Sequence, residues 1–163
     1  MEEQARRRAA HRLDLEKIRE IADEQLTGLL LVACSAHDPE PELQTRVIRH
    51  LIRHGVSVDE TDKNGVTPLH RAVRFRSPSA VEALISAGAD VNAIDRRSRS
   101  TPLHRAVTHT GAPGTAGKLD TAVAIAKILL ANGADPDIEN RNGKRAIDYV
   151  KNPEMRAVFL APQ

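Results

Sequence analysis

Cysteine and aromatic residues are scarce in this 163-residue sequence, which has one cysteine, three aromatic residues and no tryptophan. The single cysteine, Cys34, excludes an intramolecular disulfide and a zinc site made of cysteines alone. It also indicates a reducing compartment, for which we predict the cytoplasm. The longest apolar run, from Leu29 to Cys34, is too short to span a bilayer, so we expect no membrane partner. With so few aromatic residues, the core of a single domain has to be built from Ala, Leu, Ile and Val, which favours small, closely packed helices.

Two sequence motifs recur at a spacing of about 33 residues. The heptapeptide TPLHRAV occurs at 67–73 and again at 101–107. A second motif alternates with it, as HGVSVD at 54–59, AGADVNA at 87–93 and NGADPDI at 132–138. A period of this length is typical of solenoids, in which each unit buries its apolar face only by stacking on its neighbours.

Local signals divide each unit into two helices and a turn. Thr followed by Pro, at 67–68 and at 101–102, predicts an N-cap and the first residue of a helix. Glycines at positions 55, 88 and 133 supply the left-handed residue that commonly ends a helix. Each unit is therefore predicted to be a helix, a turn, a second helix and a hairpin.

The pattern resembles the ankyrin repeat, whose signature is T-P-L-H-x-A, an apolar helix, then G-A-D-x-N and a tight hairpin. The resemblance covers about residues 26–160 and implies an all-α solenoid of helix pairs with short β-hairpin-like turns. Within a repeat domain at 26–163, we expect four repeats, at about 26–60, 61–93, 94–138 and 139–162. The first and last would act as caps, and residues 1–25 would form one additional N-terminal capping helix.

Spacing between the motifs departs from a strict repeat in two places. The second hairpin is one residue longer than the other two. The third repeat carries an insertion of 11 residues, which we place at 108–120, between its two helices.

Two histidines, His70 and His104, occupy matching positions of the two heptapeptides. The resemblance implies a structural role, with each imidazole bonded near the threonine cap and bridging to the next repeat. His50 and His54 are four residues apart on one predicted helix, a spacing that can hold zinc, but the sequence places no third ligand. We therefore predict no metal site.

The segment GAPGTAGKL at 111–119 looks at first like a phosphate-binding loop. However, five residues rather than four separate Gly111 from Gly117, and Leu119 stands where Ser or Thr would hold magnesium. No Ser-His-Asp, Cys-His or paired-carboxylate set can be assembled. We predict that the protein is not an enzyme and has no cofactor; a catalytic site in the insertion is the enzymatic alternative.

The middle of the chain is basic, since residues 61–145 carry 13 Lys or Arg residues against 8 Asp or Glu residues. In the ankyrin family, partners usually bind at the hairpin tips and at the exposed end of the first helix. The resemblance implies these candidate partner-binding residues: Lys63, Arg74, Phe75, Arg76, Arg96, Arg97, Arg99, His109, Arg141 and Lys144. Arg71 and Arg105, which follow the motif histidines, extend the same strip. Stacked repeats would align these arginines in a row that binds carboxylates in a bidentate manner, with Phe75 as an apolar anchor.

The resemblance thus implies a monomeric, non-enzymatic protein–protein interaction module. We expect it to bind an acidic protein or peptide partner in its basic concave groove and at its hairpin tips. A nucleic-acid-binding module that uses the same basic face is the alternative, and the modest charge and single aromatic residue of the strip make it the weaker hypothesis. A charged face that serves only solubility is the third interpretation.

Overall fold

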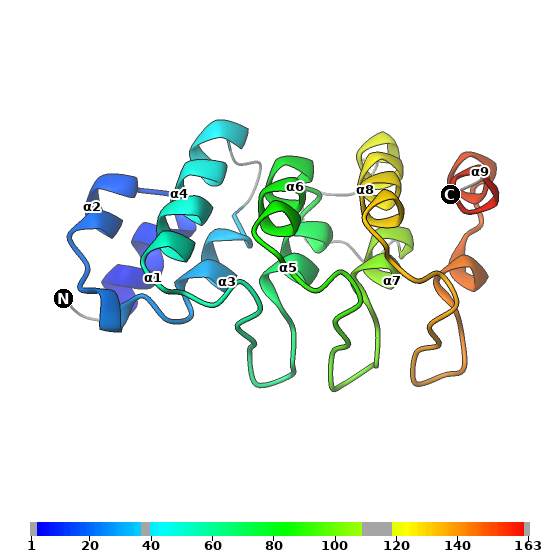
Figure 1. Ribbon diagram of the computed structural model, residues 1–163, viewed down its shortest axis with the longest axis horizontal. Helices are drawn as coiled ribbons and strands as arrows, with labels where there is room; N and C mark the ends of the chain where they lie inside the picture. The colour runs from blue at the N-terminus through cyan, green and yellow to red at the C-terminus, as the bar shows by residue number, and fades with distance from the viewer. Residues whose placement is uncertain (1–2, 37–39, 109–118, 162–163) are drawn as a thin grey trace.

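A computed structural model describes residues 3–36, 40–108 and 119–161 as an elongated stack of short helices, with the two ends of the chain at opposite ends of the stack (Figure 1). The α-helices are α1 (Glu3–His11), α2 (Leu15–Arg19), α3 (Leu29–Ala33), α4 (Pro41–Arg53), α5 (Pro68–Arg74), α6 (Pro78–Ser86), α7 (Pro102–Val107), α8 (Leu119–Ala131) and α9 (Pro153–Leu160). Two short 3-10 helices, η1 (Asp23–Gln25) and η2 (Ala146–Tyr149), complete the described elements.

The helices form two parallel rows along the stack. The inner row consists of α1, α3, α5, α7 and η2, each in contact with the next, and the outer row consists of α2, α4, α6, α8 and α9. Each inner helix is followed along the chain by an outer helix that belongs to the same unit. This arrangement is the predicted all-α solenoid of helix pairs.

Three hairpin loops project from the same side of the stack (Figure 1). Backbone hydrogen bonds close them, from Asp62 N–H to the Val66 carbonyl at 3.1 Å and from Asn140 N–H to the Lys144 carbonyl at 2.9 Å. The second hairpin is one residue longer, as predicted, since its closing bond runs from Asp95 N–H to the Ser100 carbonyl. Within the described residues these loops contain no β-strand, so the chain reverses direction in them without forming a β-sheet.

The start signals of the inner helices act as predicted. Thr67 is the N-cap of α5 and its hydroxyl oxygen accepts the His70 backbone N–H at 3.3 Å. Thr101 caps α7 in the same way through His104. In each case proline follows at the first helical position, where its missing N–H leaves no hydrogen bond unmade.

The N-terminal segment is not the single capping helix that the sequence suggested. Leu13, with φ of 57°, turns the chain after α1, and Asp14 starts a second helix by accepting the Lys17 N–H at 3.2 Å. Helix α1 packs on α3 and α2 packs on α4, so this segment forms another inner–outer pair. Ile18 of α2 and Ile21, just after it, are buried three residues apart, as Val81 and Leu84 are in α6. The prediction was wrong because the break depends on a buried leucine in a left-handed conformation, which sequence patterns do not mark.

The core consists mainly of Ala, Leu, Ile and Val side chains, as the composition predicts. Cys34 is fully buried, and burial raises the pKa of its thiol. One polar link also lies inside: Gln44 of α4 donates to the Ala33 carbonyl at 3.0 Å and accepts from the Ser77 hydroxyl. No helix in the described ranges is long and apolar enough to cross a membrane.

The insertion of the third repeat lies between the end of α7 at Val107 and the start of α8 at Leu119. Most of it, residues 109–118, falls outside the described residues. Leu119 and Asp120, which we placed in the insertion, are the first two residues of α8.

Candidate protein-docking groove

The hairpins and the inner helices enclose a groove with a volume of about 440 Å³, which we call the inner groove. Its lining residues are Asp62, Asn64, Val66, His70, Arg71, Arg74, Asp95, Arg97, Ser98, Arg105, Arg141 and Asn142. Five arginines and two aspartates are among them, so the groove has a positive balance of three charges. Groove arginines come from both helices α5 and α7 and from two successive hairpins.

Two of these arginines are paired with the two aspartates. Arg71 donates to Asp62 at 2.8 Å and Arg105 donates to Asp95 at 3.1 Å, each joining an inner helix to the hairpin that precedes it. The Asp95 side chain is fully buried. Burial alone would raise the pKa of Asp95, but hydrogen bonds from Ser98 and the charge of Arg105 outweigh it and hold that pKa below its ordinary value.

The remaining groove arginines, Arg74, Arg97 and Arg141, have no carboxylate partner in the described part of the chain. Arg141 donates instead to the Arg96 carbonyl at 2.8 Å, which fixes its position across two hairpins. Partial burial, and then the charges of Arg105 and Arg71, lower the pKa of the Arg74 guanidinium. A carboxylate bound in the groove would offset this repulsion between like charges.

A second hollow, of about 800 Å³, continues the inner groove toward the N-terminus. It shares Asp62 and Arg71 with the inner groove and adds four basic side chains of the α1 region: Arg7, Arg8, His11 and Arg12. None of these four residues is among the predicted binding residues, because residues 1–25 are expected from the sequence only to cap the solenoid. A signal was present, since RAAHR at 8–12 matches RAVRF at 71–75 in register.

The structure brings only some of the predicted binding residues together in the groove. Arg74, Arg97 and Arg141 line it. Four others, Lys63, Arg96, Arg99 and Lys144, are exposed on the hairpins outside the lining. Phe75 is half-buried at the end of α5 and is not a lining residue, and His109 lies outside the described residues.

Arg76 has a structural position instead of a place in the groove. Its guanidinium donates to the Ala106 carbonyl and to the Thr108 carbonyl, both at 3.0 Å, where α7 ends. The backbone of Arg76 is left-handed, with φ of 57°, and its side chain reaches the next repeat, whereas Arg74 lines the groove. These contacts satisfy carbonyl groups that a helix leaves unpaired at its C-terminus.

The motif histidines have the structural role that the resemblance implied. His70 Nε2 donates to the Ser100 carbonyl at 2.9 Å, and His104 Nε2 donates to the Lys144 carbonyl at 3.0 Å. Each Nδ1 therefore accepts at the threonine cap of its own helix. Burial lowers the pKa of both imidazoles, so the neutral form is favoured.

His50 and His54 lie next to each other, with ring centroids 4.3 Å apart. His54 Nδ1 is 2.9 Å from an Asp23 carboxylate oxygen. Among the described residues, no group of three or more His, Cys, Asp or Glu side chains is arranged to hold a metal ion.

Known proteins with the same pattern support this description. A family described as ankyrin repeats (3 copies) matches the chain over residues 9–95 and 30–140. The chain is 39% identical over 106 residues to "Putative palmitoyltransferase ZDHHC13" of Danio rerio, a match that covers 64% of the chain and 15% of that protein. It is 33% identical over 94 residues to Rabankyrin-5 of Mus musculus, covering 58% of the chain and 8% of that protein. The chain thus spans a small part of the length of these relatives.

A solved structure is similar over most of the chain. The ankyrin repeat domain of Bcl-3, a member of the IkappaB protein family, matches with a TM-score of 0.66 and 25% sequence identity. This match covers 82% of the chain and 51% of that structure.

Proposed function

The chain belongs to the ankyrin-repeat family, whose members are generally protein–protein interaction modules, and we propose that it binds an acidic protein or peptide in the inner groove without catalysing a reaction. One observation carries the proposal: Arg74, Arg97 and Arg141 line one groove and have no carboxylate partner in the described ranges. Guanidinium groups of this kind bind carboxylates through paired, charge-assisted hydrogen bonds.

The ion pairs on the groove wall support a specific partner rather than a diffuse positive surface. Asp62 and Asp95 neutralise Arg71 and Arg105 and hold them in place. A partner carboxylate would therefore meet three guanidinium groups that have no carboxylate partner of their own, one of which, Arg141, is held by the Arg96 carbonyl. Mismatched charge on a partner would be rejected. The basic residues of α1 would lengthen the same docking surface toward the N-terminus.

A titration with a fluorescein-labelled, glutamate-rich peptide tests this proposal. The variant Arg74→Glu with Arg97→Glu and Arg141→Glu should bind the peptide at least about tenfold more weakly than the wild type. The control variant Lys127→Glu with Lys151→Glu and Arg156→Glu makes the same change in net charge at exposed positions outside the groove. Its affinity should stay close to that of the wild type, and equal losses in the two variants would contradict the proposal.

The nucleic-acid alternative is separated by a second probe, a duplex of random DNA sequence. Binding to DNA that falls steeply with salt, together with no binding to the peptide, would favour that alternative. Few aromatic side chains are available to stack on bases, because the three in the chain, Phe75, Tyr149 and Phe159, are all partly buried. The cytoplasmic location and the monomeric state remain predictions from the sequence.

A further inference from the structure

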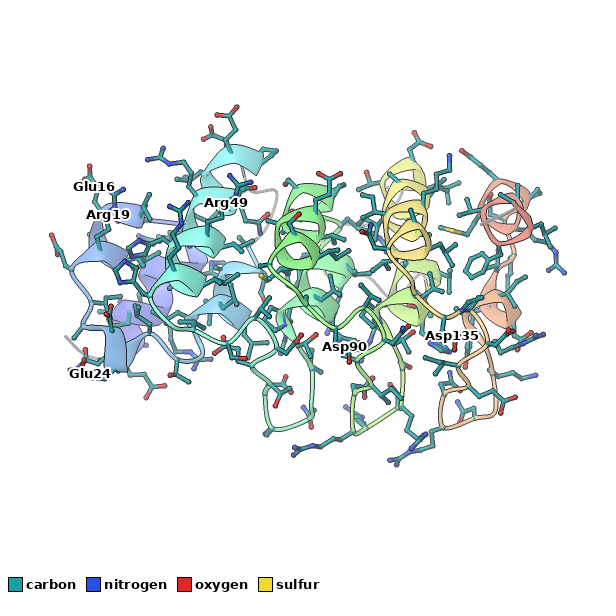
Figure 2. The ribbon with its side chains drawn as sticks, in the orientation of Figure 1. Glu16, Arg19, Glu24, Arg49, Asp90 and Asp135 are labelled. Carbon is teal, nitrogen blue, oxygen red and sulfur yellow. The ribbon has the colours of Figure 1, made fainter. Side chains whose placement is uncertain are left out.

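A second group of basic side chains lies on the outer row, away from the inner groove. Arg19 of α2 and Arg46, Arg49 and Arg53 of α4 line a small cleft of about 190 Å³ with Leu15 and His50. We call these four arginines the outer arginine cluster. Figure 2 shows Arg19 and Arg49 on neighbouring helices of the outer row.

The fold itself does not require arginine at these positions. Helix α4 buries Val47, Ile48 and Leu51 on one side. Its three arginines follow each other at three- and four-residue spacing, so they share the opposite, exposed side. At the corresponding positions, counted from the glycine after each outer helix, α6 has Ser79, Glu82 and Ser86 and α8 has Ala124, Lys127 and Ala131. At these three positions, α6 and α8 each have two small residues and one charged residue, whereas α4 has three arginines.

None of the four arginines of this cluster makes an ion pair within the part of the chain that the structure describes, and the nearby Asp23 carboxylate is bound to His54. Partial burial, followed by the charges of His54 and Arg19, lowers the pKa of His50. The four arginines line one cleft, so a bound anion would reduce the repulsion among them.

We propose that the outer arginine cluster binds the phosphate group of a phosphorylated side chain on a partner protein. A phosphate monoester carries close to two negative charges and three acceptor oxygens, and arginine forks match it in a bidentate manner. The dimensions of the cleft suit one such compact group. The site is separate from the inner groove, so it goes beyond the function proposed above.

Two features favour a compact anion over a nucleic acid or a membrane surface. The row of Arg19 and Arg49 continues on α6 with Glu82, which interrupts the positive potential that a long phosphate backbone would need. The large exposed hydrophobic side chains of the described residues are Ile94 and Leu160, which belong to other elements, so nothing apolar beside the cluster could enter a bilayer.

The test uses two fluorescein-labelled peptides of Gly and Ser that differ only in one phosphoserine. The wild type should bind the phosphorylated peptide at least about tenfold more tightly than the unphosphorylated one. The variant Arg46→Ser with Arg49→Gln and Arg53→Ser, whose two serines are those of α6, should lose this preference and keep the wild-type melting temperature. The matched variant Lys127→Gln with Lys151→Gln and Arg156→Gln removes three exposed charges outside both sites and should keep the preference.

Three results would overturn the proposal. One is equal affinity of the wild type for the two peptides, and another is a preference that survives in the outer-cluster variant. The third comes from sedimentation with phosphatidylserine vesicles: vesicle binding that depends on the cluster, without phosphopeptide binding, would assign the cluster to a membrane surface.

Discussion

The Asn140 side-chain amide donates a hydrogen bond to the Tyr149 hydroxyl at 2.9 Å, in the place where the two preceding repeats have an aspartate–arginine ion pair. In those repeats Asp62 meets Arg71 and Asp95 meets Arg105. The same link between a hairpin and the inner helix that follows it is thus made by charged groups twice and by neutral groups once. A neutral link is therefore sufficient to join a hairpin to its inner helix. The arginines of the other two links are not needed for that purpose, and they line the groove.

This relationship predicts that a neutral pair can replace the Asp95–Arg105 ion pair. Asp95→Ala should lower the free energy of unfolding by about 3 kcal/mol, because it leaves backbone N–H groups and a guanidinium without their acceptor. Asp95→Asn keeps an acceptor for the hairpin, as Asn140 does for Asn142, and should cost about 1 kcal/mol.

The double variant Asp95→Asn with Arg105→Tyr should be more stable than the sum of its single variants predicts. Urea unfolding of all four proteins gives the coupling energy, expected to be favourable by about 1 kcal/mol. A coupling energy of zero would show that the two links are not equivalent.

Neighbouring arginines should have separate effects on binding and on stability. Arg76→Ala removes hydrogen bonds to the carbonyl groups at the end of α7 and should cost about 2 kcal/mol of unfolding free energy. Its left-handed backbone is equally unfavourable for alanine, so the change reports on the side chain. Arg74→Ala should leave stability nearly unchanged and weaken binding of the glutamate-rich peptide. Thermal melts and peptide titrations of both variants decide the matter, and a reversal of the two effects would contradict the assignment.

Stability should fall as the pH drops below neutrality. Burial holds the pKa of His70 and His104 below the ordinary value of 6.5, so the unfolded chain binds protons in this range that the folded chain does not. The stabilisation is complete above pH 6.5 and is lost as the pH falls toward the lowered pKa values. Melting temperatures measured across this range should decline, and the variant His70→Gln with His104→Gln should show a flatter decline. An equally steep decline in that variant would assign the effect to other groups.

The N-terminal helix pair should contribute to the stability of the whole stack. Ile18 of α2 is fully buried, so Ile18→Ala should cost about 3 kcal/mol. Glu16 lies on the exposed side of the same helix, so Glu16→Ala should change the free energy of unfolding by less than about 0.5 kcal/mol. Urea unfolding of the two variants distinguishes an integrated pair from a loosely attached segment, for which both changes would be nearly neutral.

Local signals were enough to predict most of the fold. Thr67 and His70 lie within one helical turn, so the heptapeptide alone predicts the start of α5. The bond from His70 to the Ser100 carbonyl reaches the next repeat and was implied by the family resemblance. The break at Leu13 was missed because a buried leucine is not a residue that the sequence marks for a left-handed backbone. Arg99 shows the same effect: it has φ of 53° at the place where the other two hairpins have glycine.

The candidate site could be predicted only in outline. The sequence predicted arginines on the side of the stack where the inner groove lies, but hydrogen bonds and ion pairs decide which of them lack a partner. Arg71 is engaged by Asp62, nine positions away, and Arg76 is engaged by carbonyl groups of the next repeat at the end of α7. Both effects depend on three-dimensional proximity, which spacing along the sequence does not reveal.

Mapping the bound glutamate-rich peptide by backbone amide chemical shifts in NMR tests the central claim most directly. If the inner groove is the docking surface, the shifts will concentrate on α5, on α7 and on the hairpins that carry Arg97 and Arg141, and will disappear in the variant with all three groove arginines changed to glutamate. Shifts confined to the outer helices, or spread evenly over the chain, would contradict the account.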